Sequence, residues 1–511
     1  MEFDAALLDR LKAVTTVLES VAADWGVLDR MPIEDRRRLL QAVAGVYNPD
    51  PVARRKRMRA NERQRRAAAE RKAAAVLDDT GIRTLRRRPV YTTPNVFPPE
   101  GFNPQDVHGT HEPDAGRRAG TEAPAATVDD KHCYVCKQHY TAIHHFYDQL
   151  CPPCAALNFA KRTEITDLTG RVALLTGGRV KIGYQAGLKL LRAGATLLVT
   201  TRFPRDSAAR YAREPDFDVW GHRVQIFGLD LRHTPSVEAF CRELVATRPR
   251  LDFIINNACQ TVRRPPDFYA HMMAAETAAL GATPDRVRRL VGTYEGVRGD
   301  TRLPDVAGAT VAHSALLSQV ALLPEELRAD PQLFPAGQLD QDLQQVDLRG
   351  RNSWRLLLSE VSTVELLEVQ LVNAIAPFII NARLKPLMLR TSNRDKHIVN
   401  VSAVEGQFYR NFKTTRHPHT NMAKAALNMM TRTSATDYHG DGIHMNSVDT
   451  GWVTDEDPVE IAARKTAEQH FHPPLDIVDG AARILDPIIT GVASGTHVWG
   501  QFLKDYRSVD W

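Results

Sequence analysis

Four cysteines in two matched pairs are the residues of this chain whose spacing most directly indicates chemistry. Cys133 and Cys136 form one Cys-x-x-Cys pair, and Cys151 and Cys154 form a second. Each pair can place two thiolates on one ion from a tight turn, and two pairs complete the tetrahedron of a structural zinc site. Such a site has no open coordination position, so the pattern predicts Zn²⁺ with a structural role. Disulfides or a redox-active dithiol are the alternatives.

The segment that holds these pairs, residues 131–165, resembles a zinc ribbon or a treble-clef finger. Three histidines of the segment could replace a thiolate, but we expect them to be spectators: His139, His144 and His145.

A glycine-rich turn between an apolar run and a helical stretch gives the second chemical signal. Residues 171–183 read RVALLTGGRVKIG. A turn of this kind lets the backbone approach a pyrophosphate and aims free N–H groups and the positive end of a helix at it. A plain tight turn would look similar. The candidate cofactor-binding residues of the turn are Thr176, Gly177, Arg179, Lys181, Ile182 and Gly183.

This turn is the first of six landmarks that resemble the short-chain dehydrogenase/reductase family. Residues 176–183 are similar to the family's TGxxxGxG motif, with Lys181 in place of one glycine. The resemblance covers nearly all of residues 170–455. The other landmarks follow in the family's order: Asp230-Leu231, Asn256-Asn257-Ala258, Asn373, Asn400-Val401-Ser402 and Asp449-Thr450-Gly451.

The resemblance implies further contacts to a bound dinucleotide. They are Asp230 and Leu231 at the adenine, Asn257 and Ala258 after the fourth strand, Lys424 at the ribose, and Gly451 and Thr454 beside the nicotinamide.

The charges near the second strand favour NADP(H) as the cofactor. Sites specific for NAD place an acidic residue at the end of that strand to hold the ribose 2′-hydroxyl. Here the strand ends in Arg202, whose guanidinium could clamp a 2′-phosphate. Arg179 sits where NADP-preferring relatives often carry a basic residue. Either arginine could instead be a solvated surface charge. Lys181 either widens the glycine turn or adds charge to the phosphate contact.

The catalytic residues are where this chain departs from the family. The resemblance implies a Tyr that exchanges a proton with the substrate, a Lys four residues later, a Ser and an Asn. Asn373 and Lys424 are in place, whereas Thr420 stands at the Tyr position and Ser402 lies one residue before the usual Ser. An aliphatic hydroxyl titrates far above neutrality and cannot take the role of the phenol unaided.

Residues 405–420 form a longer connection than usual and could supply a substitute for the missing Tyr. Tyr409, His417 or His419 could fold back over the nicotinamide, and a His with a pKa near 6.5 is a suitable proton donor. Each of them could equally well only pack or cap a helix.

The elements that must position these residues alternate between strand and helix from Arg171 onward. Such alternation predicts an α/β fold, a Rossmann-like doubly wound parallel sheet with helices on both faces. We assign residues 166–511 to this domain, with a helical insertion at about 263–360 that forms a lid or a partner surface. The six expected strands are Val172–Thr176, Ala195–Thr200, Val224–Leu229, Phe253–Asn256, His397–Ser402 and Ile443–Val448.

The first 88 residues form a separate helical and basic region. Leu7, Leu11 and Val14 recur at helical spacing, a second helix is expected at Ile33–Val46, and residues 52–78 should form a third. Residues 89–130, rich in Pro, Gly and Thr, read as a linker. The third helix carries the densest run of positive charge: Arg54, Arg55, Lys56, Arg57, Arg59, Arg63, Arg65 and Arg66. Nucleic acid or an acidic partner could bind there, although a solvated helix is the favoured interpretation.

Composition excludes several classes of protein. With 511 residues, 43% hydrophobic and 25% charged, the chain can bury a sizeable core. It shows no run of 18 apolar residues for a membrane span and no signal-peptide pattern, so we expect a cytoplasmic protein.

Two functions stay open at this point. The first is an NADP(H)-dependent oxidoreductase that acts on a carbonyl or alcohol of a small molecule. The second is a catalytically inactive NADP(H)-binding sensor or scaffold. By resemblance we also expect a homo-oligomer that pairs through the helices of Asn373 and Lys424.

Overall fold

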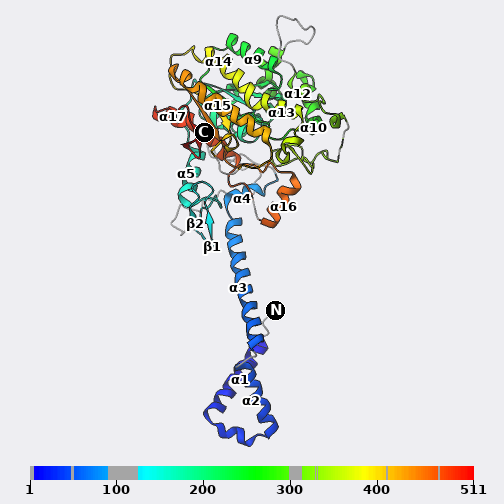
Figure 1. Cartoon of the computed structure of the whole chain (residues 1–511), viewed down its shortest axis with the longest axis vertical. Coiled ribbons are helices and arrows are strands. Elements are labelled where there is room, and N and C mark those ends of the chain that lie inside the picture. Colours follow the sequence, from blue (N-terminus) through cyan, green and yellow to red (C-terminus); the bar gives the residue numbers. More distant parts are fainter. Residues whose placement is uncertain are drawn as a thin grey trace. The chain divides into compact units, whose positions relative to one another are not determined.

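Residues 171–511 build one eight-stranded sheet, in a computed structural model of the chain (Figure 1). The strand order is β10-β9-β8-β7-β6-β3-β4-β5; all neighbours are parallel except the final β9–β10 hairpin. The strands are β3 (Val172–Thr176), β4 (Thr196–Thr201), β5 (Val224–Gly228), β6 (Phe253–Asn256), β7 (Lys396–Ser402), β8 (Ile443–Asp449), β9 (Phe502–Lys504) and β10 (Arg507–Val509).

The six strands expected from the sequence are confirmed to within a residue at each end. Their apolar side chains are buried on both faces, which is the pattern that parallel sheets require. The α/β, Rossmann-like fold is therefore confirmed. Strands β9 and β10 have only three residues each and were not expected.

Helices cover both faces of the sheet. One apolar core joins the sheet to α6 (Lys181–Arg192), α7 (Pro204–Tyr211) and α17 (Ile477–Ser494). The other core joins it to α9 (Thr234–Thr247), α14 (Ala376–Met388) and α15 (Pro418–Gly440). Shorter elements link these layers: α8 (Phe217–Trp220), η2 (Gly221–Arg223), η8 (Val404–Gly406) and α16 (Val459–Gln469).

One continuous helix combines α13 (Thr363–Gln370), a π-helical stretch labelled η7 (Leu371–Ile375) and α14. Over Thr363–Met388 it is long and apolar enough to cross a membrane by length and composition alone. A core helix passes the same test, and 44% of its most apolar window is buried inside the structure.

The insertion is only partly helical, which differs from the sequence-based expectation. It holds α10 (Pro266–Thr277), η3 (Leu280–Ala282), α11 (Asp285–Arg298), α12 (Ser314–Leu317), η4 (Pro324–Leu327), η5 (Ser353–Arg355) and η6 (Leu358–Glu360). Residues 332–352 between η4 and η5 run without a helix or strand. Its Pro and Gly residues account for the irregular backbone.

A small unit with its own hairpin precedes the sheet. Strands β1 (Ala125–His132) and β2 (His139–Ile143) pair antiparallel, and α5 (Pro152–Thr163) follows. Strand β1 therefore begins inside the segment assigned to the linker, because its small and polar residues gave no apolar alternation. The short helix α4 (Gly81–Arg86) lies beside this unit, and Ile82 joins its apolar core.

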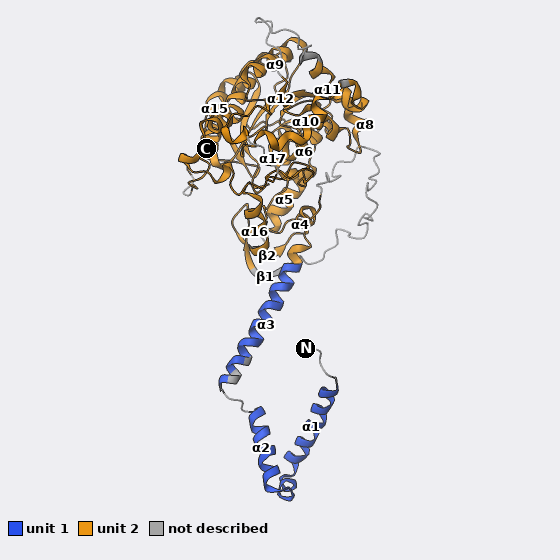
Figure 2. Cartoon of the chain, turned by 90° about the vertical axis from the view of Figure 1, so that its right-hand side faces the viewer, with its two compact units in different colours: residues 1–75 blue, residues 76–511 orange. Residues whose placement is uncertain are grey.

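The chain divides into two compact units, residues 1–75 and 76–511 (Figure 2). The structure describes residues 5–47, 51–89, 125–298, 313–327, 330, 332–409, 413–469 and 472–511. Most of the expected linker and the side chains of Arg54 and Arg57 thus lie outside the described residues.

The first unit contains α1 (Ala5–Ala23), η1 (Trp25–Arg30), α2 (Ile33–Tyr47) and most of α3 (Pro51–Asp78). The three helices lie where the sequence indicates them. Among the described residues of this unit only Leu28 is buried, so the apolar stripe of α1 finds no cover within it.

Candidate functional site

A cavity of about 660 Å³ lies at the carboxyl ends of the parallel strands. Its walls come from the turn after β3, the ends of β4, β5 and β7, and the loops after β6 and β8. The crevice at this edge of such a sheet is where dinucleotides bind. Basic side chains reach it from several segments: Arg179, Lys181, Arg202, Arg232, Arg264, Arg349 and Lys424.

The turn after β3 has the close backbone approach of a phosphate-binding loop. Gly177 has a φ of 70°, and a Cβ on it would lie 2.9 Å from the Cα of Ala258. A Cβ on Gly183 would lie 2.2 Å from the carbonyl oxygen of Gly177. The side chain of Asn257 donates to the carbonyls of Thr176 and Gly177 at 3.1 and 3.2 Å and ties the two loops together. Glycine is therefore required at both positions.

Lys181 has a positive φ, a backbone conformation that favours glycine. Its φ is 54°, and the left-handed region costs a residue with a Cβ about 1–2 kcal/mol. The lysine side chain lines the cavity, and within the described ranges no carboxylate forms an ion pair with it.

The two arginines considered for the 2′-phosphate differ in their partners. Arg202 donates to the hydroxyl of Tyr269 at 2.5 Å and lies 4.5 Å from the centroid of that ring. Its charge helps to lower the pKa of Asp230, but among the described residues it forms no direct ion pair. Arg179 is buried, forms an ion pair with Asp206 at 2.8 Å and donates to Gln344. The charge of Arg179 is thus already balanced, whereas that of Arg202 is available.

Asp230 and Leu231 both line the cavity at the end of β5. The carboxylate of Asp230 is held by Arg232 at 2.7 Å, and Arg232 also pairs with Glu368. Burial alone would raise the pKa of Asp230, but the hydrogen bonds and charge of Arg232 lower it instead. The aspartate is therefore an ionised acceptor, as a contact to an adenine amino group needs.

The irregular part of the insertion covers the cavity. Asp347 pairs with both Arg264 and Arg349, and all three side chains line the wall. The amide of Asn352 donates at 2.8 Å to the carbonyl of Glu456, which lies after β8. The sequence predicted a lid or a partner surface for this insertion but not these individual contacts, because they join distant segments.

At the other end of the cavity, Lys424 is buried and donates to the carbonyl of Val401 at 2.8 Å. Ser402 and Ala403 line the same end. The hydroxyl of Ser402 donates to the side chain of Asn428 at 2.6 Å. The serine proposed for substrate binding is therefore already engaged in a bond within the fold.

Asn373 lies in the π-helical stretch, a feature that often marks functional sites. Its side-chain oxygen accepts from the backbone N–H of Gln260 at 2.8 Å, and its amide donates to the carbonyl of Gln260 at 3.0 Å. The side chain thus holds the loop after β6 in place through both its oxygen and its amide nitrogen.

None of the expected substitutes for the family's Tyr lines the cavity. Thr420 is buried, and its hydroxyl has no hydrogen-bond partner among the described residues. Tyr409 is 52% exposed. His417 stacks on Trp354 with ring centroids 3.8 Å apart, and burial lowers its pKa to about 4. His419 is buried 3.4 Å from Glu365. The long connection packs these side chains elsewhere.

A carboxylate that the sequence did not single out lies after β8. The hydroxyls of Thr454 and Thr261 donate to Glu456 at 2.7 and 3.2 Å. Burial alone would raise the pKa of Glu456, but the charge of Lys181 and these hydrogen bonds lower it. The hydroxyl of Thr454, expected at the nicotinamide, is thus directed to Glu456. Gly451 has a φ of 73°, and a Cβ there would lie 2.0 Å from Arg483.

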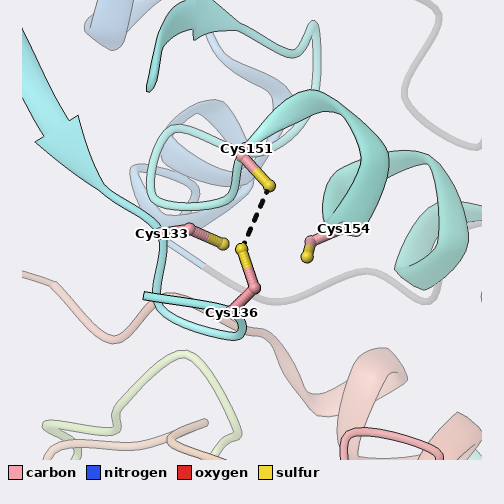
Figure 3. A group of neighbouring side chains, drawn as sticks. All are labelled: Cys133, Cys136, Cys151 and Cys154. Carbon is pink, nitrogen blue, oxygen red and sulfur yellow. Dashed lines mark hydrogen bonds between the residues drawn. The ribbon is translucent and has the colours of Figure 1, made fainter. Parts of the chain in front are cut away.

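The four paired cysteines converge on one point (Figure 3). Cys133 and Cys136 come from the turn between β1 and β2, and Cys151 and Cys154 from the start of α5. Their sulfur atoms lie within 4.8 Å of one another, and all four are unpaired thiols. The pKa of Cys136 is lowered to about 7, mainly by a hydrogen bond with the backbone of Gln138. The donor set fits one tetrahedral metal ion.

Comparison with known proteins gives matches over most of the second unit. The pattern of the family described as "short chain dehydrogenase" matches residues 171–277, and that described as "Enoyl-(Acyl carrier protein) reductase" matches residues 354–474. An uncharacterized protein of Acanthamoeba polyphaga mimivirus is 30% identical over 383 residues, which are 73% of this chain and 74% of that protein.

Other relatives match over shorter stretches. Dehydrogenase/reductase SDR family member 13 of Bos taurus is 32% identical over 118 residues, or 22% of this chain and 29% of that protein. Among solved structures, Pseudomonas aeruginosa RhlG in an NADP active-site complex is 16% identical with a TM-score of 0.39, over 66% of this chain and 95% of that chain.

The fold and the glycine turn define a dinucleotide-binding α/β protein. The chain belongs to the short-chain dehydrogenase/reductase family of oxidoreductases, of which it is a divergent member.

Proposed function

We propose that this protein is an NADP(H)-dependent oxidoreductase that interconverts a carbonyl and an alcohol. The observation that carries the proposal is a single cavity that Arg202, the glycine turn and Lys424 all line. A dinucleotide laid across the sheet would place its 2′-phosphate near Arg202, its pyrophosphate on the turn and its nicotinamide ribose near Lys424.

The preference for NADP(H) rests on Arg202. Its planar guanidinium matches a phosphate in shape and charge, and Tyr269 holds it in place without neutralising it. Phe203 and Tyr269 add aromatic surface at the same end. Lys181 contributes a second cation beside the turn, and its charge also acts on Glu456.

The chemistry needs a hydride and a proton. When bound, NADP(H) supplies or accepts the hydride at the substrate carbon. The substrate oxygen must gain a proton as the carbonyl becomes an alcohol, and Lys424 is the N–H acid that reaches the cavity beside Ser402 and Ala403. The lysine would therefore both hold the ribose and deliver the proton, which is a weaker arrangement than a phenol paired with a lysine.

The experiment is a titration of the protein with NADPH and NADH, followed by turnover with a panel of carbonyl compounds. We expect NADPH to bind more tightly than NADH and turnover to be lost in Lys424→Met. The matched control is Lys413→Met, which changes a lysine whose bonds run to the backbone of Val404 and Glu405. If NADPH does not bind, the proposal is wrong.

The buried Thr420 favours a second candidate, a cofactor sensor without turnover. In that case NADPH binds, no carbonyl is reduced, and Thr420→Tyr leaves the protein inactive. Turnover gained in Thr420→Tyr would instead show that the site lacks only its acid.

For the four cysteines we propose a structural Zn²⁺ ion. Four thiolates favour zinc over harder metals and leave no position for a substrate. Metal analysis should find one zinc per chain in the wild type and none in Cys151→Ser. Such thiolates persist in a reducing compartment, in keeping with the cytoplasmic location that we propose.

We also propose a homodimer formed by α14 and α15. Large apolar side chains are exposed on both helices and at the end of η7, which continues into α14: Ile375, Phe378, Met422 and Met429. Exposed apolar surface of this kind marks interaction sites when it is contiguous.

A further inference from the structure

The unit around the four cysteines is bound tightly to one part of the cavity wall. This part consists of residues 451–469 and 472–476, which we call the C-terminal lobe. Thr454 and Glu456 of the lobe line the cavity. We call residues 451–453 the first stem of the lobe and residues 472–476 its second stem. The two stems are joined by a hydrogen bond of 3.3 Å from the N–H of Leu475 to the carbonyl of Trp452.

The first stem is held by the cysteine unit and by α4. The hydroxyl of Tyr134, which lies between Cys133 and Cys136, accepts from the backbone N–H of Trp452 at 2.9 Å. The guanidinium of Arg86 on α4 donates to the carbonyl of Val453 at 3.1 Å. Val453 itself is 4% exposed and packs into the apolar core of the cysteine unit.

The second stem is held by the same elements. Arg86 also donates to the carbonyls of Pro473 and Leu475 at 3.2 and 2.6 Å. Gln149 donates to the carbonyl of His472 at 2.8 Å. The Nε2 atom of His472 is hydrogen-bonded to a carboxylate oxygen of Asp148, also at 2.8 Å.

A buried ion pair fixes the end of the lobe to α5. Arg162 is 2% exposed and contacts the carboxylates of Asp476 and Asp479 at 2.7 and 2.9 Å. Tyr147 donates to Asp479 at 2.5 Å. A buried charge that loses its partner costs several kcal/mol, so this ion pair fixes the position of α5 relative to the lobe.

We infer that the cysteine unit and α4 are positioning elements of the active site: when metal-loaded, they hold the C-terminal lobe in the arrangement that completes the cofactor cavity. The four thiolates fix Tyr134 relative to α5, because one cysteine pair flanks Tyr134 and the other begins the helix that carries Arg162. Both stems of the lobe are pinned from this one side, and Thr454 and Glu456 lie between the stems. The consequence for cofactor binding rests on the proposed function, whereas the holding of the lobe does not.

The test is hydrogen exchange of the cofactor-free full chain before and after zinc is removed with a chelator. We expect peptides of the C-terminal lobe to exchange at least tenfold faster in the zinc-free protein, while peptides of β3, β4 and β6 are unchanged. Unchanged exchange of the lobe, with faster exchange confined to residues 131–165, would overturn the inference.

A pair of variants separates positioning from general unfolding. Arg86→Met removes the contacts to three carbonyls of the lobe. Its matched control is Arg87→Met on the next residue, because the ion pair and hydrogen bond of Arg87 both run to Asp78 in the same segment.

We expect Arg86→Met, with zinc still bound, to speed exchange of the lobe and to weaken NADPH binding about tenfold, and Arg87→Met to do neither. Equal effects of the two variants would contradict a positioning role. A protein that never binds NADPH refutes the proposed function, whereas the exchange of the lobe still decides this inference.

Discussion

Replacing Arg202 with Met should convert a site that prefers NADPH into one that barely distinguishes NADPH from NADH. The methionine keeps an apolar stem against Phe203 and Tyr269 and removes only the guanidinium. Hydrogen bonds to a charged group contribute about 1.5–3 kcal/mol. Because 1.36 kcal/mol corresponds to a factor of ten, the loss amounts to about 10–100-fold in the dissociation constant of NADPH.

The structure supports a value near the lower end of this range. Arg202 is partly exposed at the cavity wall, so water and salt screen its charge. NADH lacks the 2′-phosphate, and its affinity should change less than about twofold. Fluorescence titration of wild type and variant with both nucleotides, at two salt concentrations, measures the difference directly.

Arg179→Met is the informative comparison. Arg179 is buried against Asp206, so its loss should destabilise the turn and weaken both nucleotides in parallel. If Arg202→Met lowered the affinities of NADPH and NADH equally, or left NADPH binding unchanged, the assignment of the 2′-phosphate to Arg202 would be refuted.

Three further outcomes are expected. Gly183→Ala should weaken NADPH binding at least about tenfold, because the added Cβ would lie 2.2 Å from a backbone oxygen. Gly292→Ala, whose Cβ would point into open space, should leave NADPH binding unchanged in the same titration. Burial lowers the pKa of His444 in the folded protein to about 4, whereas the unfolded chain binds this proton near pH 6.5. The free energy of unfolding, measured with urea, should therefore fall by about 2 kcal/mol between pH 7 and pH 5 because of this residue. His444→Gln should reduce that dependence on pH. Phe378→Glu should convert a dimer to a monomer in light scattering without changing the far-UV spectrum, and an unaltered mass would exclude this helix face as the interface.

The strands and the phosphate turn could be predicted because their signals are local. A parallel strand is a short apolar run, and residues 171–183 carry strand, turn and helix start in one continuous stretch. The cysteine pairs are local in the same sense, and the sulfur atoms do come together.

What could not be predicted depends on contacts across the chain. The ion pair of Asp347 with Arg264 joins segments 83 residues apart, and nothing near Glu456 distinguishes it from the acids beside it. The placement of Tyr409 and His417 away from the cavity likewise follows from packing: Trp354, some sixty residues earlier, provides the ring on which His417 stacks.

The departures from the family's pattern act in opposite directions at the two ends of the cavity. At the phosphate end, Lys181 has a φ of 54°. This conformation is unfavourable for a residue with a Cβ, and a glycine would not have that cost. Its ammonium lines the same wall as Arg264 and Arg349 of the insertion, which both pair with Asp347. At the nicotinamide end, Thr420 is buried and does not line the cavity, and the hydroxyl of Ser402 is hydrogen-bonded to Asn428. Under the proposed function, these cations would favour binding of an anionic dinucleotide, whereas the missing phenol would slow proton transfer. We therefore propose a tightly held cofactor with slow turnover.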